Sequence, residues 1–143
     1  MKGFLLDTNI PSEMTKPQPS ALVEKWLNDV NDDDLYLSVL SIGEILRGVT
    51  RLPESKRRTS IELWLESTLR PWFVGRILPV SLPIAERLGR MAGERDKLGR
   101  PLAIVDGLIA ATALEHNLTL VTRNVKDFVS LGVTVFNPWD SQT

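Results

Sequence analysis

The chain has 143 residues, 43% of them hydrophobic and 24% charged, with a formal net charge of -1. These values predict a single soluble domain over residues 1–143. Because the chain has no cysteine, it has no disulfides and no thiolate-bound zinc, and its single histidine argues against a histidine-based catalytic triad. No apolar run approaches the roughly 20 residues of a membrane helix and the N-terminus lacks a signal-peptide pattern, so a cytoplasmic protein with no membrane partner is expected.

The first predicted element is a short apolar strand over Met1–Leu6, which ends at Asp7. Thr8 and Asn9 follow, and Pro11 prevents the strand from continuing. In an open parallel sheet, ligands bind outside the carboxyl ends of the strands. A carboxylate at that place is costly unless water, a donor or a cation compensates it. Asp7 is therefore the first candidate for the functional site.

The next segments predict a helix and a second strand. Ser20 can cap a helix that carries Val23, Trp26 and Leu27. The acidic cluster Asn31–Asp34 is interpreted as a solvated loop, because no ligand spacing organises it as a metal site. Leu35–Val39 is the second predicted strand.

A helix is predicted to open at Ser41, and it contains a second candidate carboxylate. Ser41 and Glu44 have the spacing of a capping box, so Glu44 can satisfy a backbone N–H at the helix start. The alternative is that Glu44 points to the same crevice as Asp7. The spacing alone favours neither interpretation, and one carboxylate could serve both roles in part.

Residues 56–98 are predicted to form helices and a strand that carry no candidate site residue. The basic run Lys56–Arg58 indicates a solvated helix start more than a phosphate site, and Ile61–Phe73 has the apolar stripe of a packed helix. Arg76–Val80 is a third predicted strand. Pro83 suits the first turn of another amphipathic helix, which ends near Leu98.

The segment Leu102–Leu114 predicts a central helix, because it is apolar nearly all round. Asp106 is its one ionisable residue. An unpaired carboxylate inside such a helix is costly, so Asp106 should face a donor, a cation or a wet cleft. In the structural interpretation, Asp106 only accepts a hydrogen bond near the start of the helix. The functional interpretation is favoured because Asp7 already offers a matching site.

The remaining segments complete an alternating pattern. Leu118–Thr122 predicts a fourth strand, Val125–Leu131 a short helix that holds Asp127, and Val133–Phe136 a last strand. Strands that alternate with helices indicate an α/β domain with a mainly parallel sheet.

Asp7, Glu44 and Asp106 come from three places in the chain but can project to one sheet edge. Carboxylates forced together repel one another unless a divalent cation neutralises them. All these donors are oxygen atoms, which favours Mg²⁺, with Mn²⁺ as a substitute. A metal at such a site suits hydrolysis of a phosphate ester. The polar residues that could support the carboxylates or their waters are Thr8, Asn9, Thr122 and Asn124.

Five segments together resemble the PIN-domain ribonucleases, particularly VapC-type toxins of bacterial toxin–antitoxin pairs and their FitB-like branch. They are Leu5–Asn9, Ser41–Gly48, Asp106–Ala113, Thr122–Asn124 and Val135–Trp139. The resemblance runs essentially from end to end. It implies a magnesium-dependent endoribonuclease, a homodimer, and a small antitoxin that blocks the site. It also implies that the toxin–antitoxin complex binds its own promoter DNA through the antitoxin.

The same resemblance implies roles for individual residues. Asp7, Glu44 and Asp106 match the acidic metal-site positions of the family. Many relatives have an acid directly after the Thr-Arg pair, whereas this chain has Asn124, which would hold a second metal less tightly. Asp127 could compensate, although capping or solvation of its short helix explains it equally well. Arg47 and Arg123 are the candidates for contact with RNA phosphate, with surface ion pairing as the alternative for both.

Two other functions remain open from the sequence. In the first, the carboxylates are structural and the chain is a binding module that acts through a partner. In the second, Asp7 is the nucleophile of a small phosphohydrolase. That chemistry usually needs another acid two residues later, where this chain has Asn9.

Overall fold

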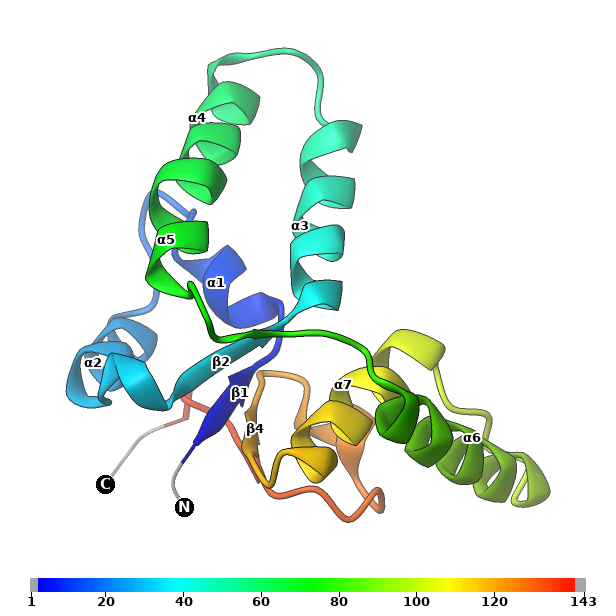
Figure 1. Cartoon of the computed structure of the whole chain (residues 1–143). Coiled ribbons are helices and arrows are strands. Elements are labelled where there is room, and N and C mark those ends of the chain that lie inside the picture. The colour runs from blue at the N-terminus through cyan, green and yellow to red at the C-terminus, as the bar shows by residue number, and fades with distance from the viewer. Residues whose placement is uncertain (1–2, 141–143) are drawn as a thin grey trace.

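The computed structural model describes residues 3–140, and it contains one parallel sheet covered by helices (Figure 1). The sheet order is β3-β2-β1-β4-β5, and every neighbouring pair is parallel. The strands are β1 (Phe4–Leu6), β2 (Leu35–Ser38), β3 (Ile77–Leu78), β4 (Thr119–Val121) and β5 (Val135–Phe136). The predicted α/β class is therefore confirmed. Of the predicted first strand, Met1 and Lys2 lie outside the described residues.

Helices connect the strands. They are α1 (Asn9–Glu13), α2 (Ala21–Asp29), α3 (Val39–Arg51), α4 (Lys56–Trp64), α5 (Arg70–Trp72), α6 (Leu82–Lys97) and α7 (Ile104–Glu115). Short 3₁₀ turns η1 and η3 lie at Asp32–Asp34 and Val125–Phe128, so the predicted helix from Val125 is shorter than expected. Between α4 and α5, the π-helical segment η2 (Leu65–Leu69) precedes Pro71, which lacks the N–H that a regular helix would use there.

The start of α3 corrects one prediction. Ser38, and not Ser41, caps this helix, because the Ser38 hydroxyl accepts from Leu40 N at 3.0 Å. Val39 is therefore the first helical residue and not the last strand residue. The capping-box interpretation of Ser41 and Glu44 was wrong, since both residues lie inside the helix. By contrast, Ser20 caps α2 and Pro83 lies in the first turn of α6, both as predicted. The cap of α6 is Ser81, which was not predicted from the sequence.

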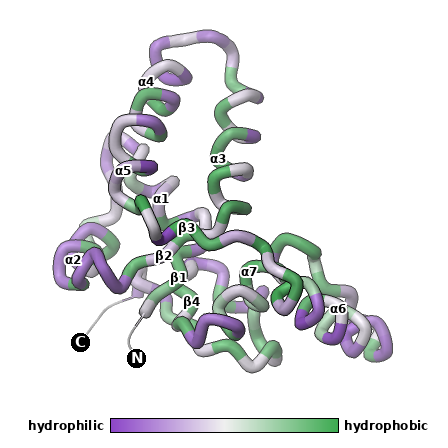
Figure 2. Tube along the Cα trace, viewed as in Figure 1, coloured by the Kyte–Doolittle hydropathy of each residue, from purple (hydrophilic) through white to green (hydrophobic). Residues whose placement is uncertain are grey.

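Two hydrophobic clusters lie on opposite faces of the sheet. Successive side chains of a strand point to opposite faces, and this alternation divides β1, because Leu6 belongs to one cluster and Leu5 to the other. The Leu6 cluster packs under α2 to α5, and the Leu5 cluster packs under α7 and η3. In Figure 2, hydrophobic residues gather around the strands and hydrophilic residues toward the outer end of α6.

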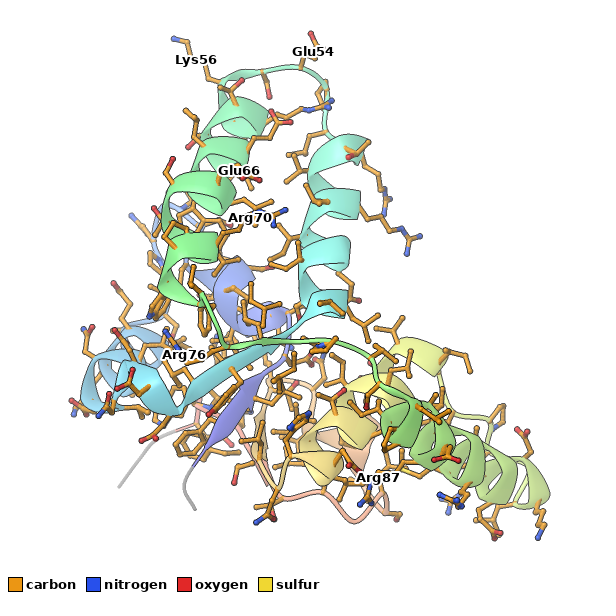
Figure 3. The ribbon with its side chains drawn as sticks, in the orientation of Figure 1. Glu54, Lys56, Glu66, Arg70, Arg76 and Arg87 are labelled. Carbon is orange, nitrogen blue, oxygen red and sulfur yellow. The ribbon has the colours of Figure 1, made fainter. Side chains whose placement is uncertain are left out.

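Helices α3 and α4 form a hairpin that extends away from the sheet (Figure 1). Arg76, labelled in Figure 3, ties α5, which continues the second arm of this hairpin toward the sheet, to η1 and the start of β2. Its guanidinium donates to the carbonyls of Asp32, Leu35 and Trp72 and lies 5.1 Å from the ring centroid of Phe73. The hairpin is thus fixed at its base and exposed at its tip.

Helix α7 is less deeply buried than its apolar sequence predicts. Ile104 is 57% exposed, and burial begins at Gly107. At Gly107 the helix approaches α6 closely, because a Cβ atom there would lie 2.4 Å from Leu88 Cδ1. The first turn of α7, which carries Asp106, therefore projects toward the surface. No helix within residues 3–140 is both long enough and apolar enough to cross a bilayer.

Candidate active site

Asp7 directly follows the central strand β1, at the carboxyl end of the sheet. The residue is 8% exposed. Its Oδ1 accepts from Thr8 N at 2.8 Å, and its Oδ2 accepts from Thr122 Oγ1 at 2.7 Å. The carboxylate is therefore held by one donor on each oxygen, and its orientation is fixed before any ligand binds.

Thr122 joins the ends of β1 and β4. Besides donating to Asp7, its hydroxyl accepts from Asn9 Nδ2 at 3.3 Å and from Asn124 N at 3.0 Å. The amide oxygen of Asn9 accepts in turn from Arg123 N at 3.4 Å. Thr122 thus brings Asn9 and the backbone of Asn124 to Asp7, whereas Thr8, the other residue predicted to support Asp7, bonds it through its own backbone N–H.

Glu44 reaches the same region from α3. The Thr8 hydroxyl donates to Glu44 Oε1 at 2.5 Å and lies 2.9 Å from Ser41 Oγ. Ser41 is fully buried, whereas Glu44 is exposed. Thr8 therefore links two carboxylates, since its backbone N–H holds Asp7 and its hydroxyl holds Glu44. Sequence reasoning missed this role of Ser41 because it assigned the residue to the helix cap.

Asp106 lies in the first turn of α7 and is half-buried. The helix cap is Ala103, and within residues 3–140 the Asp106 carboxylate makes no hydrogen bond or ion pair. It lines a cavity of about 220 Å³ together with Lys126 and Asp127. The interpretation of Asp106 as a structural acceptor at the helix start therefore has no support in the hydrogen bonding.

The carboxylates act on one another electrostatically. Burial raises the pKa of Asp7, and Glu44 and Asp127 raise it further, although the hydrogen bonds from Thr122 and Thr8 oppose the shift. Burial also raises the pKa of Asp106, and every charge that adds to this shift is a carboxylate, namely Asp7, Asp127 and Glu44. The carboxylates thus repel one another, and a bound cation would relieve that repulsion.

This donor set fits a divalent cation in charge and in chemistry. All four side chains offer oxygen, which Mg²⁺ and Mn²⁺ prefer. Within residues 3–140, no three acidic or histidine side chains are gathered into a ready-made metal cage. Mg²⁺ does not require such a cage, because it usually keeps several waters and takes one or two carboxylates directly.

We expect the raised pKa values to make stability depend on pH in an unusual direction. Folded Asp7 and Asp106 retain protons to higher pH than the unfolded chain does. Between the ordinary and the raised pKa, folding takes up protons, so their contribution to the free energy of unfolding falls as pH rises. In urea unfolding with EDTA across this pH window, the free energy of unfolding of wild type should fall relative to that of Asp7→Asn/Asp106→Asn as pH rises. If the free energies of unfolding of the two proteins changed in parallel with pH, the pKa values of Asp7 and Asp106 would not be raised in the folded protein.

The remaining candidates for the site are Asn124, which follows the Thr-Arg pair where many relatives have an acid, and Asp127. Asn124 is exposed, and its backbone N–H, not its side chain, forms the bond to Thr122. Asp127 caps no helix and lies near enough to raise the pKa of both Asp7 and Asp106. Asp127 is therefore the acidic side chain of this segment that acts electrostatically on Asp7 and Asp106.

The two predicted RNA-contact arginines lie in different surroundings. Arg47 is exposed on α3 and forms no ion pair with any residue from 3 to 140. Arg123 lies 5.2 Å from the ring centroid of Trp139 and lines a cavity with Lys126 and Asp127. Lys126, which lines this cavity and the Asp106 cavity, was missed from the sequence because an isolated lysine in a turn carries no pattern.

A family model described as PIN domain matches residues 4–132. The chain is 40% identical to Toxin FitB of Neisseria gonorrhoeae, with 95% of this chain and 98% of that protein covered. It is 33% identical to VapC ribonuclease Y4jK of Sinorhizobium fredii, with 96% and 98% covered. A structure of FitAB bound to the IR36 DNA fragment superimposes with a TM-score of 0.90 at 37% identity, covering 98% of both chains.

Proposed function

The chain belongs to the PIN domain family, and we propose that it is the toxin of a toxin–antitoxin pair, an endoribonuclease that hydrolyses RNA phosphodiester bonds. The observation that supports this proposal most directly is the group of carboxylates at the carboxyl end of the sheet. Asp7 is held there by two donors, and the charges that raise its pKa are those of Glu44 and Asp127. Like the family, the enzyme depends on a divalent metal ion, and we propose Mg²⁺, with Mn²⁺ as a substitute.

We assign the site residues as follows. Asp7 and Asp106 hold the metal ion directly or through water, and Asp127 supplies the acidic charge absent at Asn124. Bound at these carboxylates, a divalent ion supplies charge neutralisation for the phosphate and a lowered pKa for the attacking water. Thr8, Asn9 and Thr122 keep the carboxylates in place, as supporting hydrogen bonds do around metal ligands.

Glu44 also helps to bind the ion or positions the attacking water. Its Oε1 accepts from Thr8, which fixes the carboxylate, and its exposure leaves Oε2 accessible to water. From there Glu44 can accept the proton of the attacking water while the phosphodiester bond breaks. Arg123 and Arg47 are the flanking cations for RNA phosphate.

The proposed binding partners, an antitoxin and promoter DNA, are inferred from the relatives of this chain. A cognate antitoxin protein binds the chain and blocks the site, and the complex binds promoter DNA through the antitoxin. The FitAB relative is bound to a DNA fragment, which supports this arrangement. We further propose that the whole of residues 1–143 forms one domain, that the toxin is a homodimer, and that it acts in the cytoplasm.

The test is cleavage of total small RNA by antitoxin-free protein in Mg²⁺, Mn²⁺ or EDTA. We expect cleavage with either metal, loss of cleavage in EDTA, and inhibition when the antitoxin is added. Absence of cleavage by folded, metal-loaded protein across a broad RNA pool would overturn the proposal in favour of a binding module. Turnover of small phosphate esters through a phosphorylated Asp7 would instead indicate a phosphohydrolase.

A further inference from the structure

A further cavity lies beside the acidic site, between the C-terminal half of α6 and the loop after η3. Its volume of about 320 Å³ is in the range of small-molecule sites. Met91, Leu98 and Leu131 give it an apolar wall, and Arg90, Arg95 and Arg100 line it with guanidinium groups. We call it the basic cavity.

Arg95 connects the basic cavity to the acidic site. Its side chain lines both the basic cavity and the neighbouring cavity that contains Asp106, Asp127 and Lys126. The two cavities therefore share a wall. A chain of nucleotides with its scissile phosphate at the carboxylates would pass Arg95 before it reached the basic cavity.

The end of α6 holds these arginines together. Gly99 adopts a positive φ of 68°, which an L side chain rarely adopts and which reverses the chain after the helix. Arg100 N then donates to Arg95 O at 3.0 Å, and Arg95 Nε donates to Arg100 O at 2.9 Å. The reciprocal pair fixes the Arg95 guanidinium through Nε, so its two terminal nitrogens are still available to a ligand.

Four cations line the two cavities, and two of them, Arg95 and Lys126, share a cavity with Asp106 and Asp127. Within residues 3–140, Arg90, Arg95, Arg100 and Lys126 form no ion pair. The one acid of the basic cavity, Glu94, lies 3.4 Å from Lys97 Nζ. A chain with a net charge of -1 thus carries a local basic patch next to its acidic site.

We propose that the basic cavity is a nucleotide subsite, which takes one base of the RNA substrate away from the scissile bond and binds the adjoining phosphates. This inference rests on the proposed ribonuclease activity. Single-stranded RNA is recognised through splayed bases that stack on apolar groups or on arginine planes, and the apolar wall with its guanidiniums offers both. The unpaired cations supply the phosphate contacts that fix the register of the strand.

The direct test is RNA affinity, measured in an Asp7→Asn background so that the probe stays intact. The probe is a labelled, mixed-sequence, single-stranded RNA, and the readout is fluorescence anisotropy in Mg²⁺ at several salt concentrations. The test variant is Arg90→Glu/Arg100→Glu. The matched control is Arg51→Glu/Lys56→Glu, which reverses two exposed cations near the tip of the α3–α4 hairpin, where Figure 3 labels Lys56.

We expect the test variant to bind RNA at least about tenfold more weakly. The salt dependence of binding should also fall, by about 0.7 in slope for every phosphate that the variant no longer neutralises. The control should bind like its parent. Leu98→Ser, which alters a side chain that is 64% exposed, should weaken binding without a folding defect. In the otherwise wild-type chain, Arg90→Glu/Arg100→Glu should raise KM for RNA and leave kcat nearly unchanged.

Equal RNA affinity for the test and control variants would overturn the subsite. So would a test variant that loses affinity for the antitoxin while its RNA affinity is unchanged, because the cavity would then be a protein-binding site. If metal-dependent cleavage had the same KM and kcat in Arg90→Glu/Arg100→Glu as in wild type, the ribonuclease activity would stand and the proposed subsite would be wrong. RNA binding that depends on these arginines, in a chain whose wild type cleaves nothing, would reject the ribonuclease and retain the binding site.

Discussion

Asp7→Asn is expected to reduce metal-dependent RNA cleavage by about a thousandfold, which corresponds to about 4 kcal/mol of transition-state stabilisation. The amide keeps the shape of the carboxylate but loses its charge, so the site binds a divalent cation less tightly. Asn can still accept one hydrogen bond from Thr8 N or Thr122 Oγ1. The variant should therefore fold, and its free energy of unfolding in EDTA should equal or exceed that of wild type, because a buried charge has been removed.

The measurement is the initial rate of RNA cleavage, accompanied by urea unfolding. Asp106→Asn should behave in the same way, since its pKa is raised by burial and by the neighbouring carboxylates. Asp33→Asn is the matched control, because Asp33 lies in the exposed turn η1. A folded Asp7→Asn protein that cleaves RNA at the wild-type rate would mean that the site has been assigned to the wrong residues.

Phe128→Ala is expected to lower the free energy of unfolding by about 3–5 kcal/mol. Phe128 is 2% exposed and packs with Leu5 and Ile109 in the cluster under α7. Truncation leaves a cavity directly below η3, the turn that carries Asp127. The effect is therefore both a loss of apolar burial and a loosening of the support for one acidic residue.

Urea unfolding monitored by circular dichroism measures this change. Val129→Ala is the matched control, because Val129 is the next residue and is 58% exposed, so its truncation should cost less than about 0.5 kcal/mol. Equal unfolding midpoints for Phe128→Ala and Val129→Ala would show that the burial of Phe128 does not stabilise the fold.

The strand ends were predictable because they depend on local patterns. Asp7 and Thr122 each follow a short apolar run, and parallel strands place their carboxyl ends at one edge of the sheet. The start of α3 was predicted wrongly, because Ser38 and Ser41 both have cap chemistry and only the length of β2 decides between them. The exposure of Ile104 was also missed, since an apolar side chain gives no local sign of where a helix leaves the core.

The basic cavity could not be predicted from the sequence. Arg90, Arg95 and Arg100 show no motif, and they line one cavity only because α6 ends at a left-handed glycine and the chain turns back. Leu131 joins them from a segment that lies beyond α7 and β4. Sites that depend on tertiary proximity of ordinary surface residues leave no periodic signal in a single sequence.

The two outer strands of the sheet are only two residues long. β3 and β5 span Ile77–Leu78 and Val135–Phe136, and each pairs with one neighbour. An unpaired edge this short offers little template for a foreign strand, so another chain gains few main-chain hydrogen bonds by extending the sheet. A protein released from its partner would consequently resist edge-to-edge aggregation, and its specific contacts would have to be made by helix faces and side chains.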